Sequence, residues 1–169
     1  SVRVTPGKAL PDTPRRDVPV NKAGLQDRQM LTPGTPAKNT YTDRVNDGVW
    51  TLIDWDDDEK MVNKGEVKFT GGWEFTPNTY RATHVFESGT PGYTLPDAIH
   101  SYLPSDQTGL VNGDTATPGT PKRTSYIDTV NKGTWRFEEW DPESQVINKK
   151  DVEFTGIWVF DPDDVPPTK

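Results

Sequence analysis

The sequence predicts an α+β fold that is predominantly antiparallel β and consists of two tandem homologous domains. One observation is a stretch in which apolar side chains fall on alternate positions, so that one face of an extended strand carries them. Its apolar residues are Val67, Phe69, Trp73 and Phe75. The second observation is that the same pattern returns at 152–160, which is 85 positions later (152 − 67 = 85).

The spacing of 85 holds along the whole repeat. It relates Trp50 to Trp135 (135 − 50 = 85) and, with no insertion, all of 5–77 to the matching part of the second copy. A repeat of this length is large enough to close its own core, unlike a solenoid unit of ~20–45 residues. We therefore predict a first repeat at 1–79 and a second at 80–169.

The first strand of copy one is truncated or missing in the sequence. By the spacing of 85, residues 1–4 correspond to Phe86–Gly89, so Tyr80–Val85 has no counterpart. Two interpretations stay open. The sequence begins inside a longer protein, or Val2 and Val4 form a stub of that strand.

A single short helix is predicted in copy two, over 95–104. Pro96 suits a first helical position, and apolar residues recur at four-residue steps through the stretch. The matching stretch of copy one, 10–19, is broken by Pro14 and Pro19, which leave room for at most a turn.

Hairpin turns are predicted at 46–48 and at 131–133, where an Asn leads to a Gly between two strand-like segments. In the strand that follows the second turn, Trp135 and Phe137 share one face, whereas Trp140 has the opposite parity. We expect a bulge or a strand end between them.

The connection between the repeats is short and comprises Thr76, Pro77, Asn78, Thr79 and Tyr80. Pro77 restricts the backbone there, and little chain is left for a flexible linker. Because strands of nine or ten residues span ~30 Å, two units placed end to end would form an elongated rod of ~80–100 Å. From this arrangement we predict that the chain functions as a spacer, which sets how far a partner-binding domain stands from the cell.

Composition narrows the possible classes of function. The chain has no cysteine, which rules out disulfides and thiolate metal sites. Its net charge of −7 argues against binding nucleic acid or an anionic membrane directly, since both recruit clustered Lys and Arg. The sequence contains no apolar run of about 18 residues and no signal-peptide pattern.

No enzymatic activity and no cofactor are predicted. Two equal repeats with short turns lack the long loops that usually build a catalytic cleft. Both histidines, His84 and His100, lie in copy two, so neither a zinc site nor a histidine-based triad recurs in the repeat. We single out no catalytic residue.

An acidic loop in copy one offers weak candidate calcium ligands in Asp54, Asp56 and Asp58. The EF-hand template fails, because the sixth position from Asp54 is Glu59 and the twelfth is Gly65. A solvated acidic loop is the favoured interpretation, since runs of charge usually face solvent.

Two tryptophans are candidates for exposure and for binding. Trp55 and Trp140 lie beside the acidic loops and out of register with the other tryptophans. Packing in the core or between repeats is favoured for both, because aromatic side chains are usually buried.

Copy two carries a series of short motifs in a fixed order. They are Phe86–Gly92, Leu95-Pro96, Leu103-Pro104, Asp106–Leu110, Gly113-Asp114, Thr117-Pro118, Gly133–Trp135, Phe154–Gly156 and Trp158. This series resembles the SHIRT domain, the streptococcal high-identity repeats in tandem. The resemblance covers essentially all of copy two and, by the spacing of 85, copy one from Thr5 onward.

The resemblance implies a surface protein of a Gram-positive bacterium, located outside the cell and anchored to its wall. In such proteins the repeats form an elongated structural stalk that projects an N-terminal ligand-binding or adhesin region. It implies neighbouring repeats and an adhesin domain in the same chain as partners, a monomer, and no catalysis. The alternative is a module that binds a host glycan or protein through exposed aromatics or acidic loops.

Overall fold

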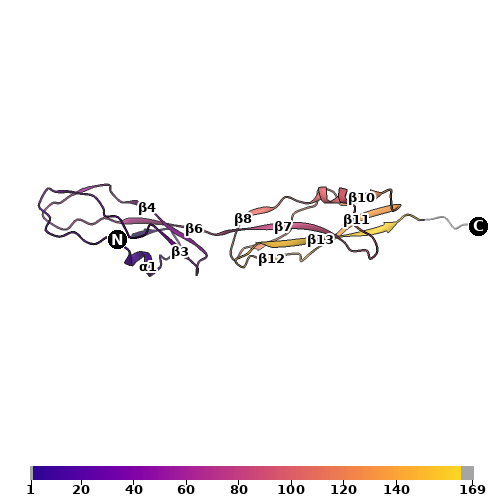
Figure 1. Ribbon diagram of the computed structural model, residues 1–169, viewed down its shortest axis with the longest axis horizontal. Coiled ribbons are helices and arrows are strands. Elements are labelled where there is room, and N and C mark those ends of the chain that lie inside the picture. The colour runs from indigo at the N-terminus through magenta and orange to yellow at the C-terminus, as the bar shows by residue number, and fades with distance from the viewer. Residues whose placement is uncertain (1, 165–169) are drawn as a thin grey trace, which may run out of the picture. The chain divides into compact units, whose positions relative to one another are not determined.

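The computed structural model describes residues 2–164. The chain divides into two compact units, unit 1 (Ser1–Asn78) and unit 2 (Thr79–Lys169). The boundary predicted from the sequence lies one residue further along. Each unit has its own sheet and its own core, as expected for a repeat of this length (Figure 1).

Unit 1 is built on a four-stranded sheet in the order β1-β6-β4-β3. Strand β1 runs parallel to β6, whereas β6, β4 and β3 pair antiparallel. A short ribbon, β2 with β5, and one helix complete the unit. The elements are β1 (Val2–Val4), α1 (Asp12–Arg16), β2 (Met30–Leu31), β3 (Thr40–Asp43), β4 (Gly48–Trp55), β5 (Lys60–Met61) and β6 (Gly71–Pro77).

Unit 2 repeats this plan with one more strand in its main sheet, whose order is β10-β11-β13-β7-β8. Strands β13 and β7 are parallel, and the other neighbours are antiparallel. The elements are β7 (Thr79–Ser88), η1 (Asp97–Tyr102), β8 (Gln107–Val111), β9 (Thr115–Ala116), β10 (Ser125–Asp128), β11 (Gly133–Asp141), β12 (Gln145–Val146) and β13 (Val152–Pro162).

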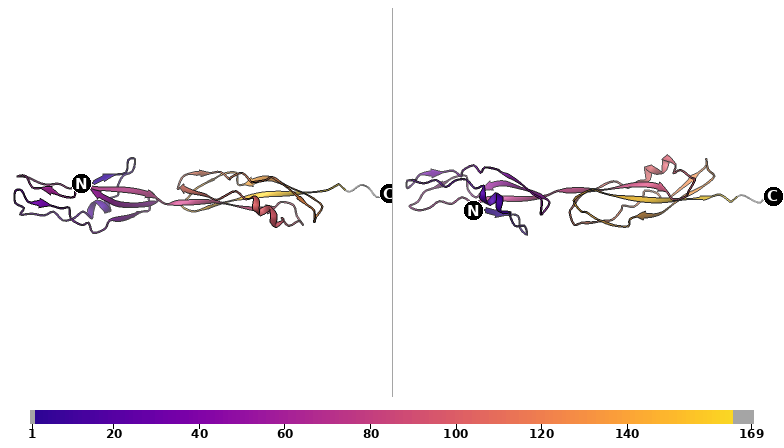
Figure 2. Two further views of the ribbon diagram at one scale, coloured as in Figure 1. Left: turned by 90° about the horizontal axis from the view of Figure 1, so that it is seen from above. Right: turned by 60° about the horizontal axis from the view of Figure 1, so that its bottom comes forward.

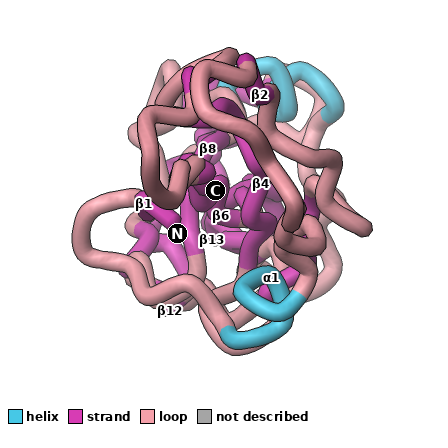
Figure 3. The backbone as a smooth tube through the Cα atoms, turned by 90° about the vertical axis from the view of Figure 1, so that its left-hand side faces the viewer, coloured by secondary structure: helices cyan, strands magenta, loops and turns pink. Residues whose placement is uncertain are grey.

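Most of the sheet is antiparallel, as predicted, and strands and loops make up most of the traced backbone in Figure 3. The sequence did not indicate that the first strand of each repeat runs parallel to the last one. That pairing joins Ala82 to Val152, residues 70 positions apart, and no local signal specifies such a contact.

Alternating burial along β13 produces the core of unit 2. Val152, Phe154, Trp158 and Phe160 are buried on one face. They divide between two apolar clusters, one of which also contains Phe86, Leu95, Ile99 and Trp135, while the other contains Ala82, Ala116 and Ile147. The core of unit 1 is a single cluster of Leu10, Trp50, Trp73 and Phe75.

The prediction of a helix in copy two alone is wrong. Unit 1 has a one-turn α-helix, α1, and unit 2 has a 3-10 helix, η1, at the matching place. Both are visible as short coils in Figure 2. Pro14 lies in the first turn of α1, where a backbone N–H would have no partner within the helix, so the proline is tolerated.

The predicted hairpins and bulge are confirmed. Strands β10 and β11 form an antiparallel pair, as β3 and β4 do in unit 1. The register of β11 against β13 shifts between Phe137 and Glu139, and that of β4 against β6 shifts between Leu52 and Asp54.

One predicted strand is shorter than expected. The pattern from Val67 onward predicts a strand like β13, but β6 begins only at Gly71. In unit 2 the corresponding residues, from Val152 onward, pair with β7. Within residues 2–164, β1 reaches only Gly71–Trp73, so no strand lies beside 67–70.

Candidate functional site

The connection between the units contains one residue outside the strands. Thr76 and Pro77 end β6, and Thr79 and Tyr80 begin β7, which leaves Asn78 between them. The Asn78 backbone N–H donates a hydrogen bond to the carbonyl oxygen of Asp47, and its side-chain amide donates to an Asp47 carboxylate oxygen, both at 2.9 Å. The connecting residue is therefore fixed to the β3–β4 turn of unit 1.

That turn is itself held by a buried carboxylate. Asp43 accepts hydrogen bonds from the backbone N–H groups of Val45 and Asn46, at 3.1 and 2.9 Å. It also accepts from the Asn46 amide at 2.8 Å and from the buried Trp50 indole at 2.9 Å. Burial by itself raises the pKa of Asp43, but these four hydrogen bonds outweigh it and the pKa lies below its usual value.

Unit 2 contains the same arrangement of hydrogen bonds around a buried Asp. Asp128 accepts from Val130, twice from Asn131, and from the indole of Trp135, at 3.1, 2.9, 2.8 and 3.0 Å. The hydrogen bonds from Asn131 are the main reason that the pKa of Asp128 is lowered. The Asp lies seven positions before the Trp in both copies, a signal in the sequence that our sequence analysis missed.

The residue that follows the last strand of unit 2 makes the same backbone hydrogen bond as Asn78. The Asp163 backbone N–H donates to the carbonyl oxygen of Lys132, at 2.9 Å. Asp163 and Lys132 are the counterparts of Asn78 and Asp47 in the repeat (163 − 78 = 132 − 47 = 85). Each unit therefore ties the chain leaving it to its own hairpin turn.

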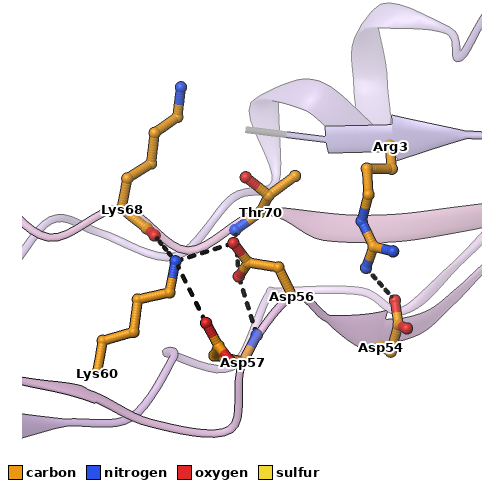
Figure 4. Close-up of polar contacts among 7 residues, drawn as sticks. All are labelled: Arg3, Asp54, Asp56, Asp57, Lys60, Lys68 and Thr70. Atoms are coloured by element: carbon orange, nitrogen blue, oxygen red, sulfur yellow. Dashed lines mark hydrogen bonds and ion pairs between the residues drawn. The ribbon is translucent and has the colours of Figure 1, made fainter.

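Three carboxylates of the acidic loop have protein partners, and those of Asp56 and Asp57 share Lys60 (Figure 4). Asp54 forms an ion pair with Arg3, whereas Asp56 accepts the backbone N–H of Thr70 at 2.9 Å and the Lys60 ammonium at 2.9 Å. The Thr70 N–H and then Lys60 lower the pKa of Asp56 to about 2. Asp58 is exposed, and residues 2–164 contain no group of three or more acidic, His or Cys side chains able to hold a metal ion.

Lys60 links the acidic loop to the segment before β6. Its ammonium donates to the carbonyl oxygen of Lys68 at 2.6 Å and lies 5.4 Å from the centre of the Phe69 ring. In unit 2 the counterpart Gln145 donates to the carbonyl oxygen of Glu153 at 2.6 Å. The hydrogen bond to the strand is thus kept although the charge is not.

The two tryptophans proposed as exposed are half-buried in the structure. The Trp140 ring packs against His84, Phe86 and Phe137, with ring centres 5.2, 5.7 and 5.3 Å apart. Trp55 borders two hollows on unit 1, of about 470 and 610 Å³. Trp140 is thus packed against the core of unit 2. Of the two tryptophans, only Trp55 borders open space.

Comparison with known proteins assigns the family. The SHIRT domain family model matches residues 1–76 and again residues 78–161. The chain belongs to the SHIRT family. These two matches correspond to the two units, with the boundary at the connection around Asn78.

A solved pair of SHIRT domains resembles the chain over most of its length. Streptococcal High Identity Repeats in Tandem (SHIRT) domains 3-4 from a cell surface protein are 39% identical, with 96% of this chain and 95% of that chain covered and a TM-score of 0.67. SHIRT domain 10 from a cell surface protein is 40% identical and covers 50% of this chain and 99% of that chain, with a TM-score of 0.47. Comparison with curated proteins gave no match.

The chain is thus a tandem pair of SHIRT repeats of the kind found in cell surface proteins. Repeats of this kind are structural modules. None of the helices in the described part of the chain is long and apolar enough to cross a membrane.

Proposed function

We propose that this SHIRT pair is a spacer within the stalk of a cell-wall-anchored adhesin of a Gram-positive bacterium. Its role is to hold an N-terminal ligand-binding region away from the cell. The partners in this proposal are neighbouring repeats and the adhesin domain of the same chain, and the pair acts as a monomer without catalysis.

The observation that carries this proposal is the single residue between β6 and β7. A flexible linker lets two domains reorient freely, whereas a connection of one residue leaves few backbone torsions to vary. Asn78 has further lost freedom, because its backbone and its side chain are both hydrogen-bonded to Asp47. A spacer needs a connection of this kind, since a loose joint shortens the mean distance that a stalk can span.

The chemistry of the surface supports the same role. A net charge of −7 keeps an extended chain well solvated. Asp54 and Asp56 of the acidic loop are engaged with Arg3, Lys60 and Thr70, so they stabilise unit 1.

Loosening the connection tests the proposal. Because the chain has no cysteine, Val20→Cys and Val146→Cys, at exposed positions in units 1 and 2, allow one spin label in each unit. Pulsed electron paramagnetic resonance should give a narrow distribution of distances between the labels. Adding Pro77→Gly with Asn78→Gly should broaden that distribution while both units stay folded.

A glycine placed elsewhere is the matched control. Lys64 has a positive φ of 53°, which glycine adopts without strain, so Lys64→Gly should leave the distance distribution unchanged. A wild-type distribution already as broad as that of the double-glycine variant would overturn the spacer proposal.

A host glycan array addresses the other class of function. As a pure spacer, the 169-residue chain should bind no glycan on it. Saturable binding that is lost in Trp55→Ala and kept in Trp140→Ala would instead assign recognition to unit 1.

A further inference from the structure

Unit 2 contains the only Asn-Gly dipeptide of the sequence, Asn112-Gly113. It lies in the turn between β8 and β9, and both residues are exposed. Asparagine is most prone to deamidation when glycine follows it, because no side chain then hinders the attack of the next backbone nitrogen on the asparagine side chain. The dipeptide is thus a chemically reactive sequence that water can reach.

Unit 1 has an aspartate at the same place. The spacing of 85 relates Asn112 to Asp27 (112 − 27 = 85). The Asp27 carboxylate accepts the backbone N–H of Lys64 at 2.9 Å, and Asn112 Oδ1 accepts the backbone N–H of Lys149 at 3.0 Å. The product of deamidation, an aspartate, therefore already occupies this place in unit 1 and makes the same hydrogen bond.

The following residue also differs between the units, although the backbone is alike. Gly113 has a φ of 92°, and its counterpart Arg28 has a φ of 66°. The Gly113 N–H donates to the carbonyl oxygen of Ile147 at 2.8 Å, as the Arg28 N–H donates to that of Val62 at 2.6 Å. A Cβ added at Gly113 would meet no atom within 4 Å, so the turn has room for a side chain there.

We propose that Asn112 is a site of spontaneous deamidation in the folded chain. The Gly113 backbone nitrogen attacks Asn112 Cγ and gives up its proton, while the side-chain nitrogen takes up a proton and leaves as ammonia. Water then opens the resulting succinimide ring at either of its two carbonyl groups, which gives aspartate or isoaspartate. One water is consumed and one ammonia is released, and nothing is oxidised or reduced.

Two hydrogen bonds of the turn act on this reaction in opposite directions. The Lys149 N–H draws electron density from Asn112 Cγ through Oδ1 and stabilises the negative charge that develops on that oxygen. The bond from Gly113 to Ile147 must break before the nitrogen can reach Cγ, which requires a local opening of the exposed turn. The folded chain should therefore react more slowly than the unfolded chain, but first at Asn112.

The two products should affect the turn differently. Asp27 shows that the aspartate form keeps the turn closed. Isoaspartate adds one atom to the backbone of a turn that is closed by the Asp114 N–H on the carbonyl oxygen of Val111, at 3.0 Å. Strand β9 begins directly after this turn and pairs with β12. Isoaspartate should therefore loosen the end of the β9–β12 ribbon.

The test is incubation of the 169-residue chain at mildly alkaline pH, folded and unfolded in urea, followed by mass spectrometry of its tryptic peptides. In the folded chain Asn112 should be converted before any other asparagine, each of which precedes a residue with a side chain. An Asn112 that stays intact over the time that converts the urea-unfolded chain would overturn the proposal. So would earlier conversion of another asparagine.

The repeat supplies the variant that should slow the reaction. Gly113→Arg introduces the residue of unit 1 and should lower the rate at Asn112 at least about tenfold, because its side chain crowds the attacking nitrogen. Gly92→Arg is the matched control, with a φ of 85° and equally open space, and should leave the rate unchanged. An unchanged rate in Gly113→Arg would exclude the succinimide and contradict the proposal.

Hydrogen exchange measured by NMR tests the effect of the products. The Ile147 N–H donates to the carbonyl oxygen of Asp114 at 2.8 Å, next to the turn. Its exchange should be unchanged in Asn112→Asp and at least about tenfold faster in the isoaspartate form purified from the incubated chain. Equal exchange in these two forms would contradict the expected loosening of the ribbon.

Discussion

Phe69 and Phe154 are the same residue at the same position of a repeat, yet one is half-buried and the other is fully buried. Both follow a Val by two positions and precede a Gly by two. The local sequence therefore sets the alternation of the strand, whereas a strand from far along the chain sets how deeply its apolar face is buried.

The hairpin turns, in contrast, are the same in the two units. Asp43 and Asp128 hold their turns with four hydrogen bonds each, and the lengths agree within 0.1 Å. All partners lie within seven residues of the Asp. The hydrogen-bonded turn consists of local contacts. It is thus the same in both units, although the two sheets differ at their other edge.

The largest predicted difference between the units concerns the two phenylalanines. Phe154→Ala removes a fully buried ring and should lower the free energy of unfolding of unit 2 by ~3–5 kcal/mol. Phe69→Ala should cost unit 1 only about 1 kcal/mol, because that ring is already partly solvated. Urea unfolding followed by NMR signals of each unit measures both. Equal losses would mean that Phe69 is buried in solution as deeply as Phe154.

The next largest effects should be equal in the two units. Asp43→Ala and Asp128→Ala each leave a buried indole N–H and the N–H groups of a turn without their acceptor, at a cost of about 2–4 kcal/mol in the unit concerned. The same urea experiment measures the loss. A clearly smaller loss in unit 1 would show that its turn does not depend on the carboxylate.

Mild acid should destabilise unit 2 more than unit 1. Burial, opposed by Asp106, lowers the pKa of His84, so the folded state disfavours the proton that the unfolded state binds below pH ~6.5. The stability that neutral His84 contributes to unit 2 is therefore complete above that pH, and it is lost as the pH falls below it. Protonation also removes the acceptor of the Gly119 N–H, between the rings of Trp140 and Phe154.

Thermal unfolding followed by NMR between about pH 7.5 and 5 measures this effect. Unit 2 should lose stability relative to unit 1, which contains no histidine. His84→Gln should abolish the relative loss, and His100→Gln, at an exposed position, should keep it. A loss that persists in His84→Gln would assign it to another group.

The smallest effect concerns Lys60 and Gln145, which occupy the same place in the repeat. Each donates a hydrogen bond of 2.6 Å to a strand carbonyl oxygen, so Lys60→Gln should keep that contact while losing the ion pair with Asp56. Because ion pairs near the surface contribute little, the unfolding temperature of unit 1 should change by no more than about 2 °C. A calorimetric shift well above this would give the acidic loop a larger structural role.

The sequence predicts the local features of this fold well. The opposite parity of Trp135 and Trp140 predicts the bulge, and the Asn and Gly of each turn predict the hairpins. The helix of unit 1 was missed because Pro14 was weighed as a helix breaker, although a proline in the first turn breaks no hydrogen bond.

Features that depend on distant contacts were not predictable in this way. The parallel pairing of β7 with β13 and the ion pair of Asp54 with Arg3 join residues that are 70 and 51 positions apart. Neither has a pattern in the local sequence. For the same reason, a row of acidic residues suggested calcium ligands, although Arg3 and Lys60 lie opposite them.

Small-angle X-ray scattering of the 169-residue chain tests the spacer proposal most directly. Two units held end to end as a rod about 90 Å long should give a radius of gyration of about 26 Å. A compact globule of this length would give about 15–16 Å, and that value would contradict the proposal that the pair extends a stalk.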